Sequence, residues 1–336
     1  MSVAQTDPVL KVTDLTLRYS TRQGEVKAVE EVSFELAKGQ SLGLVGESGC
    51  GKTSVANSLM RLLPDNARLV KGQVWLNGED LLSLSDEEVR RFRWRRIAMV
   101  FQAAMNSLDP VYKVGQQVIE AIETHGVETT IDDAEERVAR LFRLVGLDPQ
   151  LMERYPHEFS GGMRQRAIIA MALSCDPDVI IADEPTTALD VIVQDRILRE
   201  LKSIQQELRM SVIYITHDMA VVAEVTDRIG VMYAGRLVEF GNTADVFRAP
   251  MHPYTAALMS SFPSVSGERR PLGSLSGEPP NLLDPPLGCA FHPRCAYATE
   301  VCRRESPPQV SRGQQWAACW HPLDGQTSST GNHDAY

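Results

Sequence analysis

The 336-residue sequence predicts an α/β fold that is built on a mainly parallel sheet. Three observations predict it. Segments 41–45, 179–182 and 211–216 are short and continuously apolar, helical patterns lie between them, and segments 9–19 and 28–36 alternate between apolar and polar residues. Apolar strands that alternate with helices indicate a parallel sheet covered on both faces. The alternating segments indicate strands with one exposed face, so we also expect an attached antiparallel sheet.

The other elements follow from the same periodicities. Segment 54–63 is expected to form a helix, which a proline and an aspartate end. Further strands are expected at 74–76 and 97–101. The pattern from 109 to about 176 is mostly helical, and 192–207 predicts one more helix. The sequence has no internal repeat, so we expect a single copy of this arrangement.

A change in composition and periodicity near residue 249 divides the sequence into two expected domains, 1–249 and 250–336. Proline-rich stretches such as 277–288 and weak periodicity characterise the second domain. After residue 323 the sequence is polar, and we expect a disordered tail there.

The composition limits the function. Hydrophobic residues make up 43% and charged residues 23%, and the net charge of −10 argues against a broad nucleic-acid surface. The basic segment 90–96 is a local exception, because Phe92 and Trp94 between its arginines could stack on bases. A solvated cationic face is the interpretation we favour.

No apolar run approaches the ~18 residues of a membrane helix and no signal peptide is evident, so we expect a cytosolic protein.

The segment 46–53, GESGCGKT, matches the P-loop pattern between a predicted strand and a predicted helix. Its glycines let backbone N–H groups converge on phosphates, and the helix N-terminus adds its positive end. Lys52 would contact the β- and γ-phosphates, and the Thr53 hydroxyl would bind Mg²⁺. Cys50 is expected to be a spacer, with raised thiolate character from the nearby helix N-terminus. The expected nucleotide-binding residues are Gly46, Glu47, Ser48, Gly49, Cys50, Gly51, Lys52, Thr53 and Ser54.

The segment 179–184, VIIADE, is an apolar strand that ends in two carboxylates, which is the Walker B arrangement. Asp183 would hold Mg²⁺ directly or through water, and Glu184 would polarise the attacking water. Two acids that only cap a strand are the alternative, which the upstream P-loop weakens.

A third motif, Ser160, Gly161, Gly162 and Met163, opens a predicted helix. Ser160 is a suitable N-cap, and the glycines leave backbone N–H groups uncovered. Such a helix start can bind an anion, but the P-loop of the same chain already holds the phosphates. We therefore expect the motif to serve the nucleotide of a second chain. A glycine-rich linker is the alternative, although linkers do not lead directly into an apolar helix.

With these motifs in order, the sequence resembles the ATPase subunit of an ABC transporter over nearly its whole length. The resemblance implies an ABC cassette at 1–249, with a RecA-like core, an antiparallel β subdomain and a helical subdomain at about 103–176. It implies that segment 160–163 is the signature loop, with Met163 where glutamine is commoner. It also assigns Gln102 to the Q-loop, which senses Mg²⁺, Asp190 to the D-loop, His217 to the switch histidine and Tyr19 to adenine stacking.

The resemblance also implies a mechanism. Two cassettes enclose two MgATP molecules, each held by the P-loop of one chain and the signature loop of the other. Glu184 carries hydrolysis, His217 contacts the γ-phosphate, and Gln102 completes the catalytic set.

Segments 252–258 and 288–295 resemble the C-terminal extension of oligopeptide and dipeptide importer ATPases, a branch that includes nickel and some oligosaccharide importers. The implied partners are two transmembrane permease subunits, a second and similar ATPase in a heterodimer, and an extracytoplasmic substrate-binding protein. The chain would then be peripheral, at the cytoplasmic face of the membrane. A soluble ABC ATPase that acts on nucleic acid is the alternative, and the acidic charge counts against it.

Four cysteines, Cys289, Cys295, Cys302 and Cys319, crowd into this extension with the spacing C-x₅-C-x₆-C-x₁₆-C. In a reducing compartment such a cluster indicates a metal site before disulfides. The spacing fits neither the usual zinc pairs nor short ferredoxin runs, so it does not name the metal. The family resemblance implies a 4Fe–4S cluster, with zinc or a simple loop staple as alternatives. His292 and His321 are possible substitute ligands.

Overall fold

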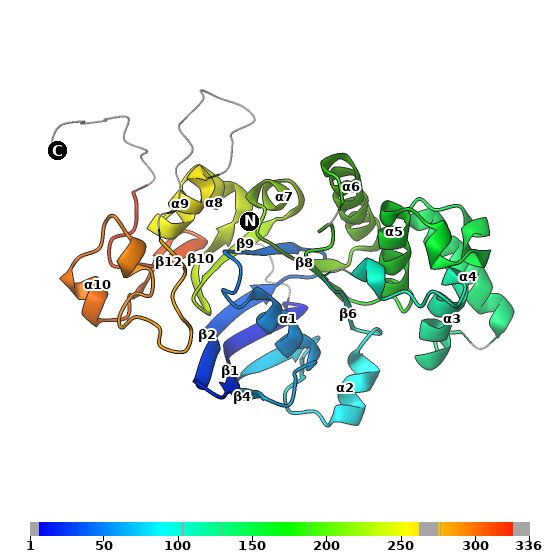
Figure 1. Ribbon diagram of the computed structural model, residues 1–336, viewed down its shortest axis with the longest axis horizontal. Coiled ribbons are helices and arrows are strands. Elements are labelled where there is room, and N and C mark those ends of the chain that lie inside the picture. The colour runs from blue at the N-terminus through cyan, green and yellow to red at the C-terminus, as the bar shows by residue number, and fades with distance from the viewer. Residues whose placement is uncertain are drawn as a thin grey trace.

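Two β-sheets organise the chain (Figure 1). The computed structural model describes residues 7–102, 104–128, 130–187, 189–261, 275 and 277–324. Within these residues the larger sheet has the strand order β11-β12-β10-β9-β3-β8-β7-β6, and the smaller has the order β2-β1-β4-β5.

The larger sheet contains the predicted parallel core. Its strands are β3 (Ser41–Val45), β6 (Ile97–Val100), β7 (Val179–Asp183), β8 (Ser211–Thr216), β9 (Arg228–Tyr233), β10 (Arg236–Asn242), β11 (Gln309–Arg312) and β12 (Gln315–Ala318). Pairing is parallel from β6 through β7, β8 and β3 to β9. Every residue of β3, β7 and β8 is buried, which accounts for their continuously apolar sequences. The prediction of a mainly parallel core is confirmed.

The smaller sheet is antiparallel, as predicted. It consists of β1 (Leu10–Thr21), β2 (Gly24–Leu36), β4 (Ala67–Leu76) and β5 (Glu79–Asp80). Helix α1 (Lys52–Met60) lies between the two sheets and contacts β1 and β2 on one side and β6 and β7 on the other. Val55 and Leu59 of α1 are buried in the core that both sheets share.

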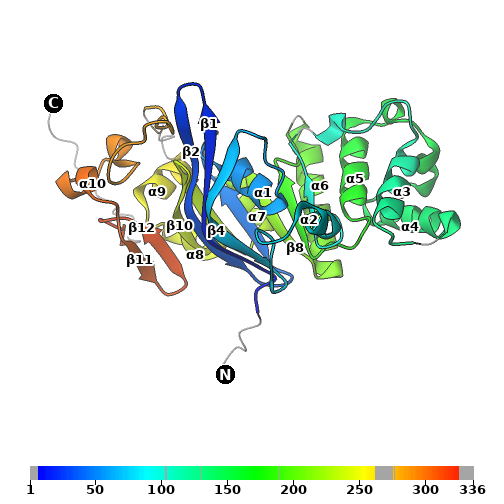
Figure 2. The ribbon, with the colours of Figure 1, turned by 90° about the horizontal axis from the view of Figure 1, so that it is seen from below.

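Helices from the middle of the chain gather at one end of the molecule (Figures 1 and 2). They are α3 (Val114–Thr124), α4 (Ile131–Leu144) and α5 (Gly161–Ala172), with the short 3₁₀ turns η1 (Ala104–Asn106), η2 (Pro149–Glu153) and η3 (Pro156–Glu158). Their apolar faces form one core cluster with residues of β6, β7 and β8. The remaining helices are α2 (Asp86–Phe92), α6 (Val191–Leu208), α7 (Met219–Val225), α8 (Thr243–Arg248), α9 (Pro253–Ser260), α10 (Glu300–Arg304) and the turn η4 (His292–Arg294). No described helix is both long and apolar enough to cross a membrane.

The C-terminal segment lies at the opposite end and joins the larger sheet (Figure 1). Strand β12 pairs antiparallel with β10. The fully buried carboxylate of Glu239 on β10 accepts hydrogen bonds from Met251 N (2.7 Å), His252 N (2.9 Å) and Gln315 Nε2 (2.7 Å). This one side chain therefore ties the residues beyond 249 to the sheet. The boundary at 249 stays a prediction, and the predicted disordered tail lies, from residue 325 on, outside the described residues.

Candidate nucleotide-binding site

The fold brings four predicted site segments to the same edge of the larger sheet. In the parallel pairing Val45 of β3 lies opposite Thr216 of β8, Ile215 of β8 opposite Asp183 of β7, and Ala182 opposite Val100 of β6. The carboxyl ends of all four strands therefore meet. The P-loop follows β3, Glu184 follows β7, His217 follows β8 and Gln102 follows β6. Ligands of open α/β sheets bind at this edge.

The P-loop needs its glycines for close backbone packing. Gly46 has φ 149°, and a Cβ atom there would lie 2.2 Å from the Met232 carbonyl oxygen. Gly51 has φ 106°, and a Cβ atom there would lie 2.3 Å from the Ala28 carbonyl oxygen. Gly51 is also the N-cap of α1, and among the described residues no side chain caps this helix start. Its N–H groups are available to an anion, as a phosphate site requires.

Lys52 is folded back over the P-loop. Its Nζ donates to the carbonyl oxygens of Gly46 (2.8 Å) and Glu47 (3.0 Å), and the residue is buried. Cys50 is buried beside it, and burial raises the pKa of its thiol although the Lys52 ammonium opposes the shift. The expected thiolate character of Cys50 is therefore wrong, because loss of solvation outweighs the positive surroundings.

Asp183 has a buried carboxylate that fits a Mg²⁺ ligand. The residue is 1% exposed, and neither carboxylate oxygen has a hydrogen-bond partner among the described residues. Burial raises the pKa of Asp183, while the nearby Thr53 hydroxyl and Lys52 ammonium act in the opposite direction. A buried, unpaired carboxylate is costly unless a cation or a hydrogen bond compensates it. Asp183 and Thr53 thus form an oxygen donor set of the kind that Mg²⁺ prefers.

Glu184 is held by three side chains from three different segments. Gln102 Nε2 donates to Oε2 (2.7 Å), Thr187 Oγ1 donates to Oε2 (3.0 Å), and His217 Nδ1 lies 3.0 Å from Oε1. Burial raises the pKa of Glu184, but the hydrogen bonds with His217 and Thr187 outweigh it and lower the pKa. The carboxylate is therefore ionised at neutral pH, as a proton acceptor must be.

The backbone of Glu184 is strained as well. Its φ of 46° lies in the left-handed region, and its N–H donates to the Ile215 carbonyl oxygen at 2.8 Å. A non-glycine residue adopts this conformation only where its surroundings enforce it, and such residues cluster at functional sites.

Tyr19 of β1 contacts Ser54, which lies in the first turn of the P-loop helix α1. The Tyr19 hydroxyl on β1 lies 3.3 Å from Ser54 Oγ on α1, so the ring is anchored beside the helix start. Ser48 and Gly49 are exposed at the tip of the loop.

The predicted signature loop lies apart from the P-loop. Ser160 is the N-cap of α5, and its Oγ accepts from Met163 N at 3.3 Å. Ser160 is exposed, while Gly161, Gly162 and Met163 are half-buried. Figures 1 and 2 both separate α5, in the helical end of the molecule, from α1 between the sheets.

Asp190 of the predicted D-loop is the N-cap of α6, where its carboxylate accepts from Val193 N at 3.0 Å. The two residues after it, Val191 and Ile192, are 80% and 81% exposed. Large apolar side chains so exposed are typical of a surface that another protein covers. Ala188 of the same loop lies outside the described residues.

Two residues that contact the P-loop were not predicted from the sequence. Tyr254 accepts a hydrogen bond from Glu47 N at 3.0 Å, and Arg294 forms an ion pair with the Glu47 carboxylate. Tyr254 belongs to a segment that the sequence singled out for its family resemblance, but no local signal connects either residue to the P-loop.

Family models and relatives agree with this geometry. The ABC transporter model matches residues 29–187, and the model of the oligopeptide/dipeptide transporter C-terminal region matches residues 238–302. The chain is 44% identical over 322 residues to the oligopeptide transport ATP-binding protein OppD of Escherichia coli, covering 95% of each chain. The chain belongs to the oligopeptide/dipeptide family of ABC transporter ATPases.

Other relatives place this ABC ATPase in the same family. It is 45% identical over 318 residues to the dipeptide transport ATP-binding protein DppD of Bacillus subtilis, covering 94% of this chain and 95% of the relative. Its fold resembles the dimeric, post-hydrolysis state of the ATP-binding cassette MJ0796 bound to ADP and Pi, with a TM-score of 0.62 and 26% identity. That match covers 70% of this chain and 98% of the other.

The four late cysteines of the ABC ATPase line one small pocket together with His252, His292 and His321. The pocket has a volume of about 10 Å³, and the cysteines are free thiols. Burial raises the pKa of Cys289, Cys295 and Cys319. Within the part of the chain that the structure describes, no three such side chains are arranged to hold a metal ion. The thiols thus converge, but they do not form a metal-binding geometry.

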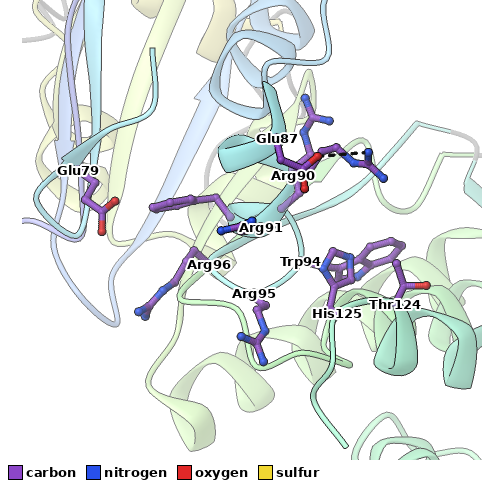
Figure 3. A pocket seen from close by; sticks show the side chains of 11 residues that line it. Glu79, Glu87, Arg90, Arg91, Trp94, Arg95, Arg96, Thr124 and His125 are labelled. Carbon is purple, nitrogen blue, oxygen red and sulfur yellow. Dashed lines mark ion pairs between the residues drawn. The ribbon is translucent and has the colours of Figure 1, made fainter. Parts of the chain in front are cut away.

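The basic segment 90–96 lines a cleft beside the C-terminal end of α3 (Figure 3). Most of its side chains bind other parts of the ABC ATPase. Arg93 donates to the carbonyl oxygens of Met60 and Arg61, Trp94 to that of Met171 and Arg95 to that of Gly126, and Arg96 pairs with Asp178. These bonds support a structural role for the segment, with its remaining cationic atoms in solvent.

Proposed function

We propose that this chain is one motor subunit of an ABC importer for di- or oligopeptides, and that the residues assembled around Glu184 hydrolyse MgATP. The observation that carries the proposal is the placement of an ionised, triply held Glu184 beside the buried, unpaired carboxylate of Asp183. Glu184 would accept a proton, and the residue before it, Asp183, would bind the cation.

The hydrolytic step follows from these roles. Bound Mg²⁺, held by Thr53 and Asp183 with Gln102 nearby, would neutralise charge on the β- and γ-phosphates. Glu184 orients a water molecule and accepts its proton as the water oxygen bonds to the γ-phosphorus. The bond between that phosphorus and the β–γ bridging oxygen breaks, and ADP leaves. His217 keeps Glu184 in place and reaches toward the γ-phosphate.

A complete site requires a second cassette. The exposed N-cap Ser160 and the exposed pair Val191 and Ile192 support this part of the proposal, because both are left uncovered by the chain itself. We infer that residues 160–163 contact the nucleotide on the P-loop of a second, similar ATPase, with Asp190 at the same interface. A heterodimeric pair is the arrangement we favour.

The Q-loop region is the surface we assign to the two transmembrane permease subunits. Phe101, Val111 and Tyr112 are 45%, 70% and 56% exposed, and Phe101 precedes Gln102 directly. Movement of this surface would reach Glu184 through the Gln102 hydrogen bond. The chain would then work at the cytoplasmic face of the membrane, below an extracytoplasmic substrate-binding protein.

Peptides are the cargo that the family supports. The names of the relatives specify dipeptide and oligopeptide transport, and the C-terminal region matches the model for that branch. Nickel and oligosaccharide complexes are the alternative cargoes. The nucleic-acid alternative is disfavoured, because the basic segment is used for bonds within the chain.

The experiment that tests this function is transport by the reconstituted complex. The chain, its partner ATPase and both permeases are placed in lipid vesicles with the binding protein outside. We expect ATP hydrolysis to rise, and labelled peptide to enter, when the binding protein carries a peptide. Stimulation by a nickel complex or an oligosaccharide, with none by peptides, would contradict the assigned cargo.

We also infer that Cys289, Cys295, Cys302 and Cys319 hold a 4Fe–4S cluster, with zinc as the alternative metal. Their convergence on one pocket supports it, although the thiols would have to reorient around the cluster. Protein purified without oxygen is expected to be brown and to absorb near ~400 nm. Colourless protein with one equivalent of zinc would favour the alternative, and metal-free protein would contradict both.

A further inference from the structure

The cysteine-bearing segment reaches directly into the P-loop. Arg294 Nη1 and Nη2 lie 2.6 Å and 2.9 Å from the two carboxylate oxygens of Glu47, which is the second residue of the loop. The pair is bidentate and joins residues 247 positions apart. Arg294 is 5% exposed at its side chain and Glu47 is 25% exposed, so the pair is largely shielded from solvent. A shielded, two-pronged pair is stronger and more directional than a surface ion pair.

The contacts of Glu47 hold the P-loop in its observed conformation. Its N–H donates to the Tyr254 hydroxyl at 3.0 Å, and its carbonyl oxygen accepts from Lys52 Nζ at 3.0 Å. With Arg294 on the carboxylate, the amide, carbonyl and side chain of this residue are all engaged. The same residue therefore positions Lys52 and is itself positioned from outside the cassette core.

The surroundings of Arg294 make this contact rigid. Its guanidinium lies 5.9 Å from the ring centroid of Tyr233 and within hydrogen-bond reach of the Tyr233 hydroxyl at 3.4 Å. Phe291, which is 3% exposed, packs against the rings of both Tyr233 and Tyr254 at 5.3 Å and 5.4 Å. Arg294 and Phe291 both come from the turn between Cys289 and Cys295.

We propose that Arg294 is a positioning residue for ATP binding, and that it acts through Glu47 on the P-loop. The turn between Cys289 and Cys295 is thereby a part of the nucleotide site. This inference rests on the proposed function in one respect, namely that the P-loop is where ATP binds.

The physical reason is preorganisation. A P-loop held at Glu47 already has the conformation that phosphates require, whereas a released loop must be ordered when the nucleotide binds. Glu47 contacts Lys52 and two residues of the C-terminal segment, whereas three other side chains hold the water-activating group Glu184. Loss of the pair should therefore weaken ATP binding and leave the rate of the chemical step nearly unchanged.

The test compares Arg294→Gln and Arg294→Lys with Arg304→Gln in the assembled transporter. Arg304 is the matched control, because it makes an exposed ion pair with Glu300 at 2.7 Å in the same segment and does not contact the P-loop. Equilibrium binding of a fluorescent ATP analogue and steady-state hydrolysis are measured together. For Arg294→Gln we expect about a tenfold rise in Kd and KM for ATP, with kcat within about twofold of the parent. Arg294→Lys keeps the charge but not the bidentate geometry, so its effect should be intermediate.

A double-mutant cycle with Glu47→Gln decides the route of the effect. If Arg294 acts through Glu47, the double variant should bind ATP no more weakly than either single variant. Additive losses would overturn the proposal, as would an Arg294→Gln protein with lower thermal stability but unchanged Kd for ATP. If Arg294→Gln does not fold, Arg294→Lys gives the same comparison. Failure of the proposed function would look different, because the parent protein itself would then bind no ATP.

Discussion

The chain contains two glycine-rich helix starts that differ in how they are completed. The start of α1 has no side-chain cap, its loop takes three left-handed glycines, and Lys52, Tyr254 and Arg294 surround it. The start of α5 is capped by its own exposed Ser160, and α5 lies in the helical end of the molecule, apart from α1 (Figure 1). At the first start the P-loop backbone and Lys52 converge, while the second presents an exposed hydroxyl apart from the P-loop.

In the proposed two-cassette arrangement, one chain would therefore contribute two unequal halves, each to a different nucleotide site. The half at α1 should determine how tightly this chain binds ATP. The half at α5 should determine whether a second cassette can hydrolyse its ATP. A variant at the start of α1 should therefore change ATP binding by this chain. A variant at the start of α5 should change ATP hydrolysis by the second cassette.

The largest effect is expected at Glu184. Glu184→Gln removes the proton acceptor but keeps the side-chain shape and the partners Gln102 and Thr187, so hydrolysis at the site of this chain should fall by at least about 10³-fold. ATP binding should persist, because Lys52 and the α1 start are untouched. Hydrolysis by the complex and binding of an ATP analogue give the two values. Undiminished hydrolysis in the complex with the partner ATPase would refute the assignment.

A smaller effect is expected at the other helix start. Ser160→Ala removes a hydroxyl that would contact the nucleotide of the second cassette, and hydrolysis at that cassette's site should fall about 10²-fold. The change also removes a helix cap, which costs about 1 kcal/mol of stability. Ser85→Ala controls for that loss, because Ser85 caps α2 in the same way and lies outside the site. Equal hydrolysis rates in the two variants would contradict the role of Ser160.

Tyr19 should affect binding alone. Tyr19→Ala removes the ring expected to stack on adenine, and the Kd for ATP should rise about tenfold. Tyr19→Phe is the matched control, because it keeps the ring and loses only the contact of the hydroxyl with Ser54. We expect Tyr19→Phe to bind ATP almost as the parent does, and a tenfold weaker Tyr19→Phe would show that the hydroxyl, not stacking, matters.

The smallest effect concerns the reactivity of Cys50. Burial raises the pKa of the Cys50 thiol above its usual range, so little of the reactive thiolate is expected at neutral pH. Iodoacetamide should therefore label Cys50 far more slowly in the native chain than in urea-unfolded chain. Mass spectrometry of the digested protein measures both rates. Rapid native labelling at neutral pH would restore the thiolate interpretation.

Much of the cassette could be predicted because its signals are local. The continuously apolar β3, β7 and β8 are central strands, and the motifs that follow them lie at one edge because parallel strands end together. Strands β9 to β12 and the pairing of β12 with β10 were not predicted. Their order depends on contacts such as Gln315 with Glu239, which are distant in the sequence.

The same reason explains what was missed in the site. The P-loop residues were identified from their own spacing, but Arg294 and Tyr254 reach Glu47 only through the folded C-terminal segment. The prediction of thiolate character at Cys50 was wrong because the burial of this residue is not evident from the sequence. A helix N-terminus can be read from the sequence, whereas the Met232 and Ala28 backbone that closes over the loop cannot.

Photolabelling by a reactive ATP analogue tests most directly whether residues 160–163 of this chain complete the nucleotide site of its partner. The assembled transporter carrying Ser160→Ala only in this chain is trapped with vanadate and labelled. We predict that the trapped label is lost from the partner ATPase and retained on this chain, whose own P-loop is intact. Loss of the label from this chain, with the partner still labelled, would contradict the account.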